Sequence, residues 1–124
     1  MKNAFELKRL GELYLEKGDY DTAEMLFRRA ISIEEVQAPN SVALAEDFYN
    51  LGLLLSVSNK KSEAQSMLMK AWKIERLILG PMHPETVETF KTMTEIDYEE
   101  EDSVTTEFFY YAPRQSASGV RAMH

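Results

Sequence analysis

Histidine and cysteine are the side chains that most often do chemistry near neutral pH, and this sequence contains few of them. The chain has 124 residues with no cysteine and two histidines, His83 and His124. Without a thiol it offers no cysteine nucleophile, thiolate zinc site or disulfide. A metal site needs three or four ligands, and His83 has one possible histidine companion, at the end of the chain. These residues give no pattern for nucleophilic or metal chemistry.

Carboxylates are the next candidates, because the chain has 21 Asp and Glu against 14 Lys and Arg, a formal net charge of -7. The acidic run "DYEEEDS" lacks the glycine that a calcium-binding loop requires. A glycine-rich phosphate loop and a serine nucleophile elbow are also missing. We predict no catalytic residues, no metal and no cofactor. The negative charge disfavours nucleic acid as a partner.

His83 lies in the stretch "LGPMHPET", residues 79–86, which we interpret as a turn. Gly80 suits the left-handed cap of a preceding helix, and Pro81 prevents that helix from resuming. Pro84 suits the first position of a following helix. His83 then occupies the N-cap position, where a ring nitrogen can accept a hydrogen bond from a free backbone amide. The stretch predicts a connection between two helices.

The elements around this turn recur along the chain. Residues 7–33 align without a gap with residues 48–74, at an offset of 41. The matched pairs include Leu10 with Leu51, Gly11 with Gly52, Ala23 with Ala64, and Ala30 with Ala71. A third copy starts at an offset of 42 and fades at Thr94, which stands where Gly52 stood. A fixed period of this length is typical of a helical repeat protein.

Within each copy the apolar residues recur every three or four positions, the period of a half-buried helix. The predicted helices span residues 4–17, 22–36, 41–57, 62–79 and 84–98. The pairs Asn3 with Glu6, Asp21 with Glu24, and Ser62 with Gln65 have the spacing of a capping box at a helix start. Gly18 and Asn59 tolerate the left-handed backbone needed between antiparallel helices. The fold class is therefore all-α.

The stretch "LGELYLEKGDYDTAEMLFRRAISI" resembles the tetratricopeptide repeat, with Gly11 and Ala23 allowing paired helices to approach and Phe27 packing between them. The period of 41 to 42 residues and the "LGPMHPET" connector are similar to the kinesin-light-chain type of this repeat. The resemblance implies an α-solenoid of antiparallel helix hairpins. A repeat domain is expected over residues 1–98, with units 4–40 and 41–83 and a half unit 84–98.

The resemblance also implies a non-catalytic protein whose first helix in each unit lines a concave groove for a partner's peptide or helix. The groove positions are Phe5, Lys8, Glu12, Leu15, Glu46, Tyr49, Asn50, Leu53, Glu88, Lys91, Glu95 and Tyr98. Because glutamates predominate among the charges, we expect a partner with basic and apolar residues. Some relatives clamp a C-terminal carboxylate. Lys8 and Asn50 match that clamp, but Glu12 and Glu88 would repel a carboxylate.

The array stops in its third unit, so the last helix is expected to expose Val87, Phe90, Met93 and Ile96 where its second helix would lie. Residues 99–124 are interpreted as an acidic linker, an aromatic capping segment and a flexible tail. Phe108, Phe109, Tyr110 and Tyr111 form the aromatic cluster of this segment. They are expected to cover the open flank of their own chain or that of a second copy. The segment fits either a short helix or an extended strand.

Three functional hypotheses follow. The first is a protein-binding adaptor or scaffold, and the second is a self-assembly module that dimerises through its C-terminal end. The third is a regulatory domain of a larger protein. The charged start "MKNAFELKRL" lacks the apolar stretch of a secretory signal, and no apolar run is long enough to span a membrane. A cytoplasmic location without membrane contact is the expectation.

Overall fold

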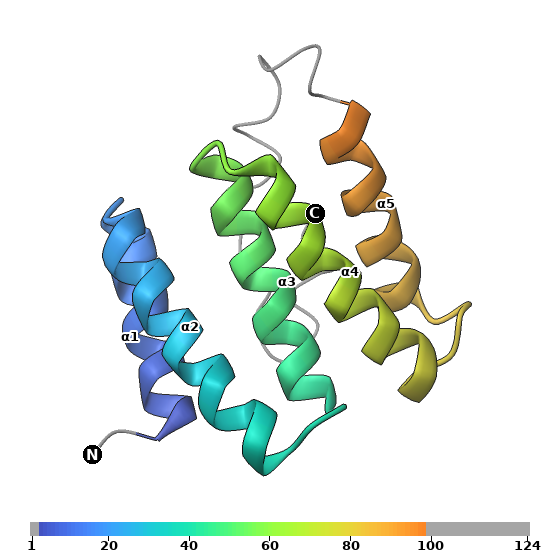
Figure 1. The fold of residues 1–124 in the computed structure, drawn as a ribbon, viewed down its shortest axis with the longest axis horizontal. Helices are drawn as coiled ribbons and strands as arrows, with labels where there is room; N and C mark the ends of the chain where they lie inside the picture. The colour runs from blue at the N-terminus through green and yellow to red at the C-terminus, as the bar shows by residue number, and fades with distance from the viewer. Residues whose placement is uncertain (1–2, 99–124) are drawn as a thin grey trace.

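The computed structural model describes residues 3–98, and these residues form five α-helices. The helices are α1 (Ala4–Glu16), α2 (Tyr20–Gln37), α3 (Val42–Val57), α4 (Lys61–Ile78) and α5 (Pro84–Tyr98), as Figure 1 shows. No strand occurs between residues 3 and 98. The all-α prediction is confirmed, and every helix begins and ends within two residues of its predicted bounds.

The helix starts agree with the sequence in one case and differ in two. Asn3 and Glu6 form the predicted capping box at α1. For α2 the prediction was wrong, because the N-cap is Asp19, whose carboxylate accepts hydrogen bonds from the backbone amide and hydroxyl of Thr22. For α4 it was also wrong, because the helix begins after Lys60 with no side-chain cap. The expected capping partner Gln65 instead donates to the Met93 carbonyl oxygen of α5, at 3.4 Å.

The turns follow the local chemistry of the sequence. Gly18, Asn59 and Gly80 all adopt positive φ, at 83°, 66° and 98° respectively. Pro84 opens α5, and Nδ1 of His83 accepts a hydrogen bond from the Glu85 backbone amide at 3.1 Å. His83 is therefore a capping residue, as the sequence predicted.

Glycines allow the two helices of each hairpin to pack closely. A Cβ atom at Gly52 of α3 would lie 2.8 Å from Leu68 Cγ of α4. At Gly11 of α1 it would lie 3.1 Å from a ring carbon of Phe27 of α2. Leu68 and Phe27 are among the most buried side chains of the described residues. Each hairpin is thus joined at a position where a glycine leaves room for a large apolar side chain.

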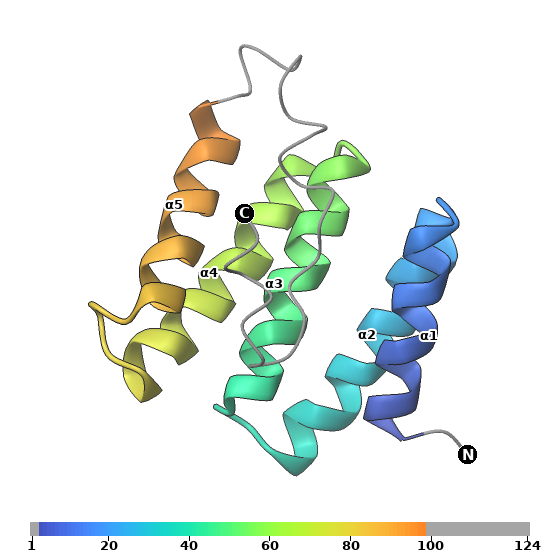
Figure 2. The same cartoon turned by 180° about the vertical axis from the view of Figure 1, so that it is seen from behind.

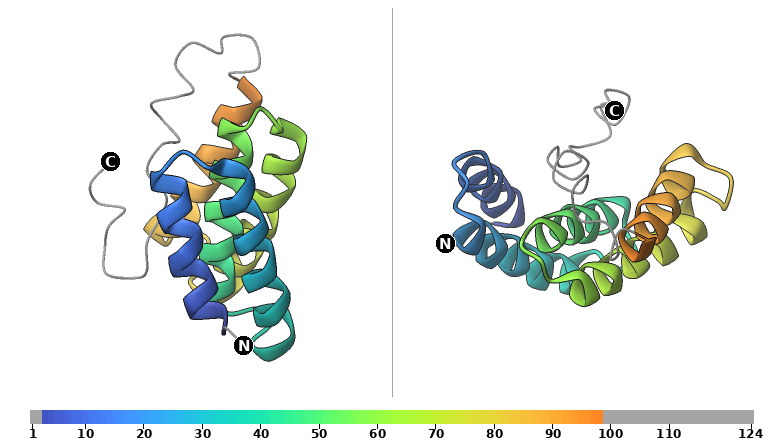
Figure 3. Two further views of the ribbon diagram at one scale, coloured as in Figure 1. Left: turned by 90° about the vertical axis from the view of Figure 1, so that its left-hand side faces the viewer. Right: turned by 90° about the horizontal axis from the view of Figure 1, so that it is seen from above.

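The hairpins and α5 form a curved array. Viewed from above, α1, α3 and α5 lie on the inner side of an arc, and α2 and α4 lie on its outer side (Figure 3). Figure 2 looks toward the inner side, with α1 in front of α2 and α3 in front of α4. The main core joins α2, α3, α4 and α5, and a smaller cluster fills the space between α1 and α2.

One expectation about α5 needs correction. Val87 and Phe90 are half exposed, at 48% and 47%, as expected. Met93 and Ile96 were expected to be exposed on the same flank, but they are buried, at 8% and 1%. They belong to the core that includes α4, because they lie on the side of α5 that packs against the preceding hairpin. The open flank is therefore restricted to the first half of α5.

An ion-pair network on the outer side fastens the first hairpin to the second. Glu24 of α2 accepts hydrogen bonds from Arg28 at 2.9 Å and from Lys60 at 3.1 Å. Arg28 also pairs with Glu63 of α4, at 3.1 Å. Burial by itself would raise the pKa of Glu24, but the hydrogen bonds and charges of Arg28 and Lys60 lower it. Glu24 should therefore stay ionised, and keep its ion pairs, in mild acid.

Replacing Glu24 with glutamine is expected to lower the free energy of unfolding by about 1 kcal/mol at neutral pH, since two charge-assisted hydrogen bonds lose their acceptor charge. A lowered carboxyl pKa stabilises the fold above the unfolded value and loses this contribution as pH falls through the folded value. The difference between wild type and Glu24→Gln should therefore shrink in acid. Urea unfolding at several pH values measures it, with Glu63→Gln, at a more exposed pair, as the milder control.

The predicted acidic linker, capping segment and tail, including Phe108, Phe109, Tyr110 and Tyr111, lie outside the described residues. Within residues 3–98, no helix combines the length and the apolar character needed to cross a bilayer.

Candidate functional site on the concave face

The floor of the concave face is α3, the middle helix of the inner row. Glu46, Tyr49, Asn50 and Leu53, four of the residues expected to line the groove, lie on this helix and are all buried. The Oδ1 atom of Asn50 and the Oγ atom of Ser56 are buried without a hydrogen-bond partner. The middle of the concave face therefore consists of buried polar and apolar groups of α3. The accessible groups of the face belong to the flanking helices α1 and α5.

On α1, the predicted groove residues follow one stripe of the helix, at a spacing of three or four residues. Phe5 is 61% exposed, and Lys8, Glu12 and Leu15 are partly buried. Burial raises the pKa of Glu12, although Lys8 and Arg9 oppose this effect. Phe5 also lies 5.7 Å from the Arg9 guanidinium, which is over its ring. Phe5 is thus a large exposed aromatic side chain on α1.

On α5, the predicted residues Glu88 and Glu95 are partly buried and Lys91 is exposed. The hydroxyl of Tyr49 on α3 lies 3.5 Å from the Glu88 carboxylate and 3.4 Å from the Thr92 hydroxyl. Tyr98 is the last residue of α5, and its side chain lies outside the described part of the structure. The structure thus brings Tyr49 and Glu88 together across the inner row.

A cluster that the sequence analysis missed joins α1, α2 and α3. Asp47 of α3 is 1% exposed, and its Oδ1 atom lies 3.2 Å from Nζ of Lys8 on α1. The carboxyl group of Glu34 on α2 is near enough to the same aspartate to raise its pKa. One ammonium group faces two carboxyl groups, so a second negative charge there would be poorly compensated. The arrangement holds one carboxyl group protonated.

The electrostatics of this cluster are set by burial. Burial raises the pKa of Asp47 to about 8, the neighbouring carboxyl group of Glu34 adds to the rise, and the charge of Lys8 opposes it. Burial would lower the pKa of Lys8, but Asp47 raises it above its usual value, so the ammonium stays charged. No sequence motif marks these residues, because they come from three helices and two different units.

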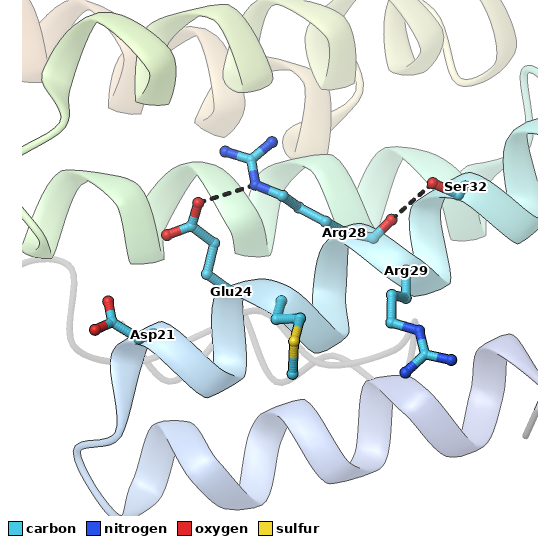
Figure 4. A pocket seen from close by; sticks show the side chains of 6 residues that line it. Asp21, Glu24, Arg28, Arg29 and Ser32 are labelled. Atoms are coloured by element: carbon cyan, nitrogen blue, oxygen red, sulfur yellow. Dashed lines mark hydrogen bonds and ion pairs between the residues drawn. The ribbon is translucent and has the colours of Figure 1, made fainter.

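A hollow of about 460 Å³ lies along α2, away from the residues predicted for the groove. Figure 4 shows its lining, with Arg28 turned toward Glu24 and Arg29 pointing to the opposite side of the helix. Ser32 donates a hydrogen bond to the Arg28 carbonyl oxygen at 3.1 Å. The charges of Glu24 and Arg28 serve the network between hairpins. This hollow contains no nucleophile paired with a base, and we assign it no chemistry.

Neither region has the composition of a metal centre: within residues 3–98, no three His, Cys, Asp or Glu side chains are grouped to hold an ion. The concave face offers apolar contact, acidic side chains and hydrogen-bonding groups instead. Such a surface suits recognition of a polypeptide.

Comparison with known proteins agrees with this geometry. A family model described as tetratricopeptide repeat matches residues 3–76, which include both hairpins except the last two residues of α4. No curated protein matched the chain.

Proposed function

Because the chain belongs to the tetratricopeptide repeat family, we propose that it is a non-catalytic adaptor that holds a segment of a partner protein against its concave face. The observation that carries this proposal is the position of α1, α3 and α5, which lie together on the inner side of the arc (Figure 3). The contact of Lys8 with Asp47 supports the placement of the α1 stripe toward α3.

The accessible groups on this face favour a partner segment with lysine or arginine beside apolar residues. Phe5 offers an exposed apolar ring, and Glu12, Glu88 and Glu95 supply carboxylates on the two flanking helices. Lys8, the groove cation that contacts α3, is already paired with Asp47. Opposite charge then steers the partner to the face, and the apolar contacts supply most of the affinity.

The same pairing argues against a clamp for a terminal carboxylate. In such a clamp Lys8 would have to meet the ligand's carboxylate, but here its ammonium group lies 3.2 Å from a buried aspartate. Glu12 and Glu88 would add repulsion. We therefore propose recognition of an internal segment of the partner and not of its C-terminus.

We also propose that the repeats are of the kinesin-light-chain type. The offset of 41 to 42 residues supports this assignment, as does the "LGPMHPET" connector. The connector has the geometry expected from its sequence, with Gly80 at positive φ and His83 capping α5. Units at 4–40 and 41–83 with a half unit at 84–98 remain our proposed division.

A matched pair of exposed apolar residues tests the proposed site. Phe5 is on α1 with the predicted groove residues, and Met25, which is 52% exposed, lines the hollow on α2. Peptides selected from a displayed library on the full chain should be rich in basic and apolar residues. Phe5→Ala should then weaken their binding about tenfold or more, because a buried aromatic ring contributes about 1.5 to 3 kcal/mol.

Titration calorimetry with a selected peptide measures the effect, and Met25→Ala should leave the affinity unchanged. The salt dependence of binding gives a second readout, because contacts with Glu12, Glu88 and Glu95 weaken as ionic strength rises. Selection of acidic peptides, or equal losses in the two variants, would refute the proposed site.

A further inference from the structure

The open flank of the last unit contains an aromatic pocket that the proposed function does not use. The pocket has a volume of about 230 Å³ and is lined by Trp72, Pro81, Thr86, Val87 and Phe90. Trp72 of α4 and Phe90 of α5 lie with ring centroids 5.7 Å apart. We refer to it as the Trp72 pocket.

The repeat itself shows what covers this position elsewhere in the chain. Val87 and Phe90 correspond to Ala45 and Phe48 of the second unit at an offset of 42. Ala45 and Phe48 are buried in the core that includes α4, whereas Val87 and Phe90 are about half exposed. The first half of α5 therefore lacks the cover that α4 gives to α3.

The third unit lacks the glycine on which the close packing of a second helix depends in the first two units. In the first two units the close approach depends on Gly11 and Gly52, where an added Cβ would lie 3.1 Å from Phe27 and 2.8 Å from Leu68. Thr94 stands at this position in the third unit, and its hydroxyl is held by a hydrogen bond of 2.8 Å to the Lys91 carbonyl oxygen. The threonine side chain fills the space that a helix packed like α2 or α4 would need. This replacement favours a cover other than a closely packed repeat helix.

The chain carries a suitable occupant just beyond α5. Residues 99–107 span up to about 30 Å when extended, and Phe90 lies about 12 Å back along the helix from Tyr98, so residues 108–111 can return to the pocket. These four residues are Phe108, Phe109, Tyr110 and Tyr111, and their rings match an aromatic pocket. We propose that they seat individual rings in the Trp72 pocket of the same chain, in place of a repeat helix along α5.

The charges also favour a path of the connecting stretch back toward the Trp72 pocket. The Arg76 guanidinium lies over the ring of Trp72, a lining residue of the pocket, 5.4 Å from its centroid. The connecting stretch begins with the four acidic residues "EEED" at positions 99–102. An acidic stretch that runs past Arg76 brings opposite charges together and places the aromatic cluster beyond them. A second copy would need to bring the same groups together from a separate molecule.

The only tryptophan of the chain lies in this pocket and reports on it directly. The chain has no cysteine, so Ala112→Cys in the full chain introduces a single site, next to the aromatic cluster, for a bimane dye. Tryptophan quenches bimane on close approach. We expect strong quenching with Trp72, recovery of the emission in the Trp72→Phe variant, and no dependence on protein concentration. Equal emission from the two variants, or quenching that disappears on dilution, would refute the proposal; the second result would assign the pocket to a second copy.

Substitution of the rings gives an independent test. The double variant Phe108→Ser and Phe109→Ser should shift the Trp72 emission to longer wavelength and lower the melting temperature of the full chain. Met123→Ser, near the end of the chain, is the control and should change neither. Unchanged Trp72 emission in a folded double variant would overturn the proposal. If the double variant does not fold, the bimane measurement, which leaves all four rings in place, still decides the question.

Discussion

Replacing Gly52 with valine is expected to lower the free energy of unfolding by about 3 kcal/mol, because the new side chain would enter space that Leu68 already fills. An added Cβ would lie 2.8 Å from Cγ and 3.0 Å from Cδ2 of this leucine, and 3.3 Å from the Ala64 carbonyl oxygen. Leu68 is fully buried, so its branch point cannot move aside without displacing the core. Urea unfolding followed by circular dichroism measures the loss.

Alanine at Gly52 and at the equivalent glycine of the first unit, Gly11, gives a matched comparison. At Gly11 an added Cβ meets the edge of the Phe27 ring at 3.1 to 3.3 Å, which a small tilt of the ring relieves. Alanine in a helix interior also gains about 1 kcal/mol over glycine. Gly11→Ala should therefore be nearly neutral, whereas Gly52→Ala should still destabilise the protein. A Gly52→Ala variant as stable as wild type would show that α3 and α4 do not approach each other this closely at Gly52.

The second large effect is a dependence of stability on pH that Asp47→Asn removes. The folded state holds the pKa of this carboxyl group at about 8, against 3.8 for an unperturbed aspartate. Between these values the folded state keeps a proton that the unfolded state has released. The free energy of unfolding therefore falls as pH rises through this range, by up to about 1.4 kcal/mol per pH unit, and levels off above the folded pKa.

Asparagine resembles the protonated acid and does not titrate, so Asp47→Asn should be more stable than wild type in mild base by about 2 kcal/mol or more, with little difference in mild acid. Urea unfolding at pH values from acid to mild base measures this divergence. Lys8→Met should extend the decline to higher pH, because it removes the charge that lowers the pKa of Asp47. Glu35→Gln, on an exposed part of α2, is the control and should leave the profile unchanged. Parallel profiles for wild type and Asp47→Asn would contradict the raised pKa.

The helix starts show where reasoning from sequence reaches its limit. Asp19 and Asp21 both have a side chain able to cap α2, and local sequence does not choose between them. Gly18 adopts a positive φ and completes the turn, so Asp19, the next residue, is the N-cap of α2. At α4, Gln65 has the spacing of a capping partner, but α5 places the Met93 carbonyl oxygen within its reach. A tertiary neighbour thus redirected a side chain that the local pattern assigned elsewhere.

The sequence by itself determined the helices, their pairing and the turn at residues 79–86. These features depend on groups close together in the chain: the spacing of apolar residues, the positions of Gly80 and Pro84, and the recurrence of Gly11 as Gly52. Such interactions act between residues close together in the chain, so they can be predicted from the sequence.

Only the tertiary structure decided which polar groups are buried and which part of the last helix is open. Lys8, Glu34 and Asp47 come from three helices. The protonation state of Asp47 depends on its distance from the other two groups and on its burial away from solvent. Met93 and Phe90 are one turn apart on α5 with similar apolar character, but one packs into the core with α4 and the other borders the Trp72 pocket. Burial is a property of the neighbours that surround a residue, and these neighbours are brought together by packing between units.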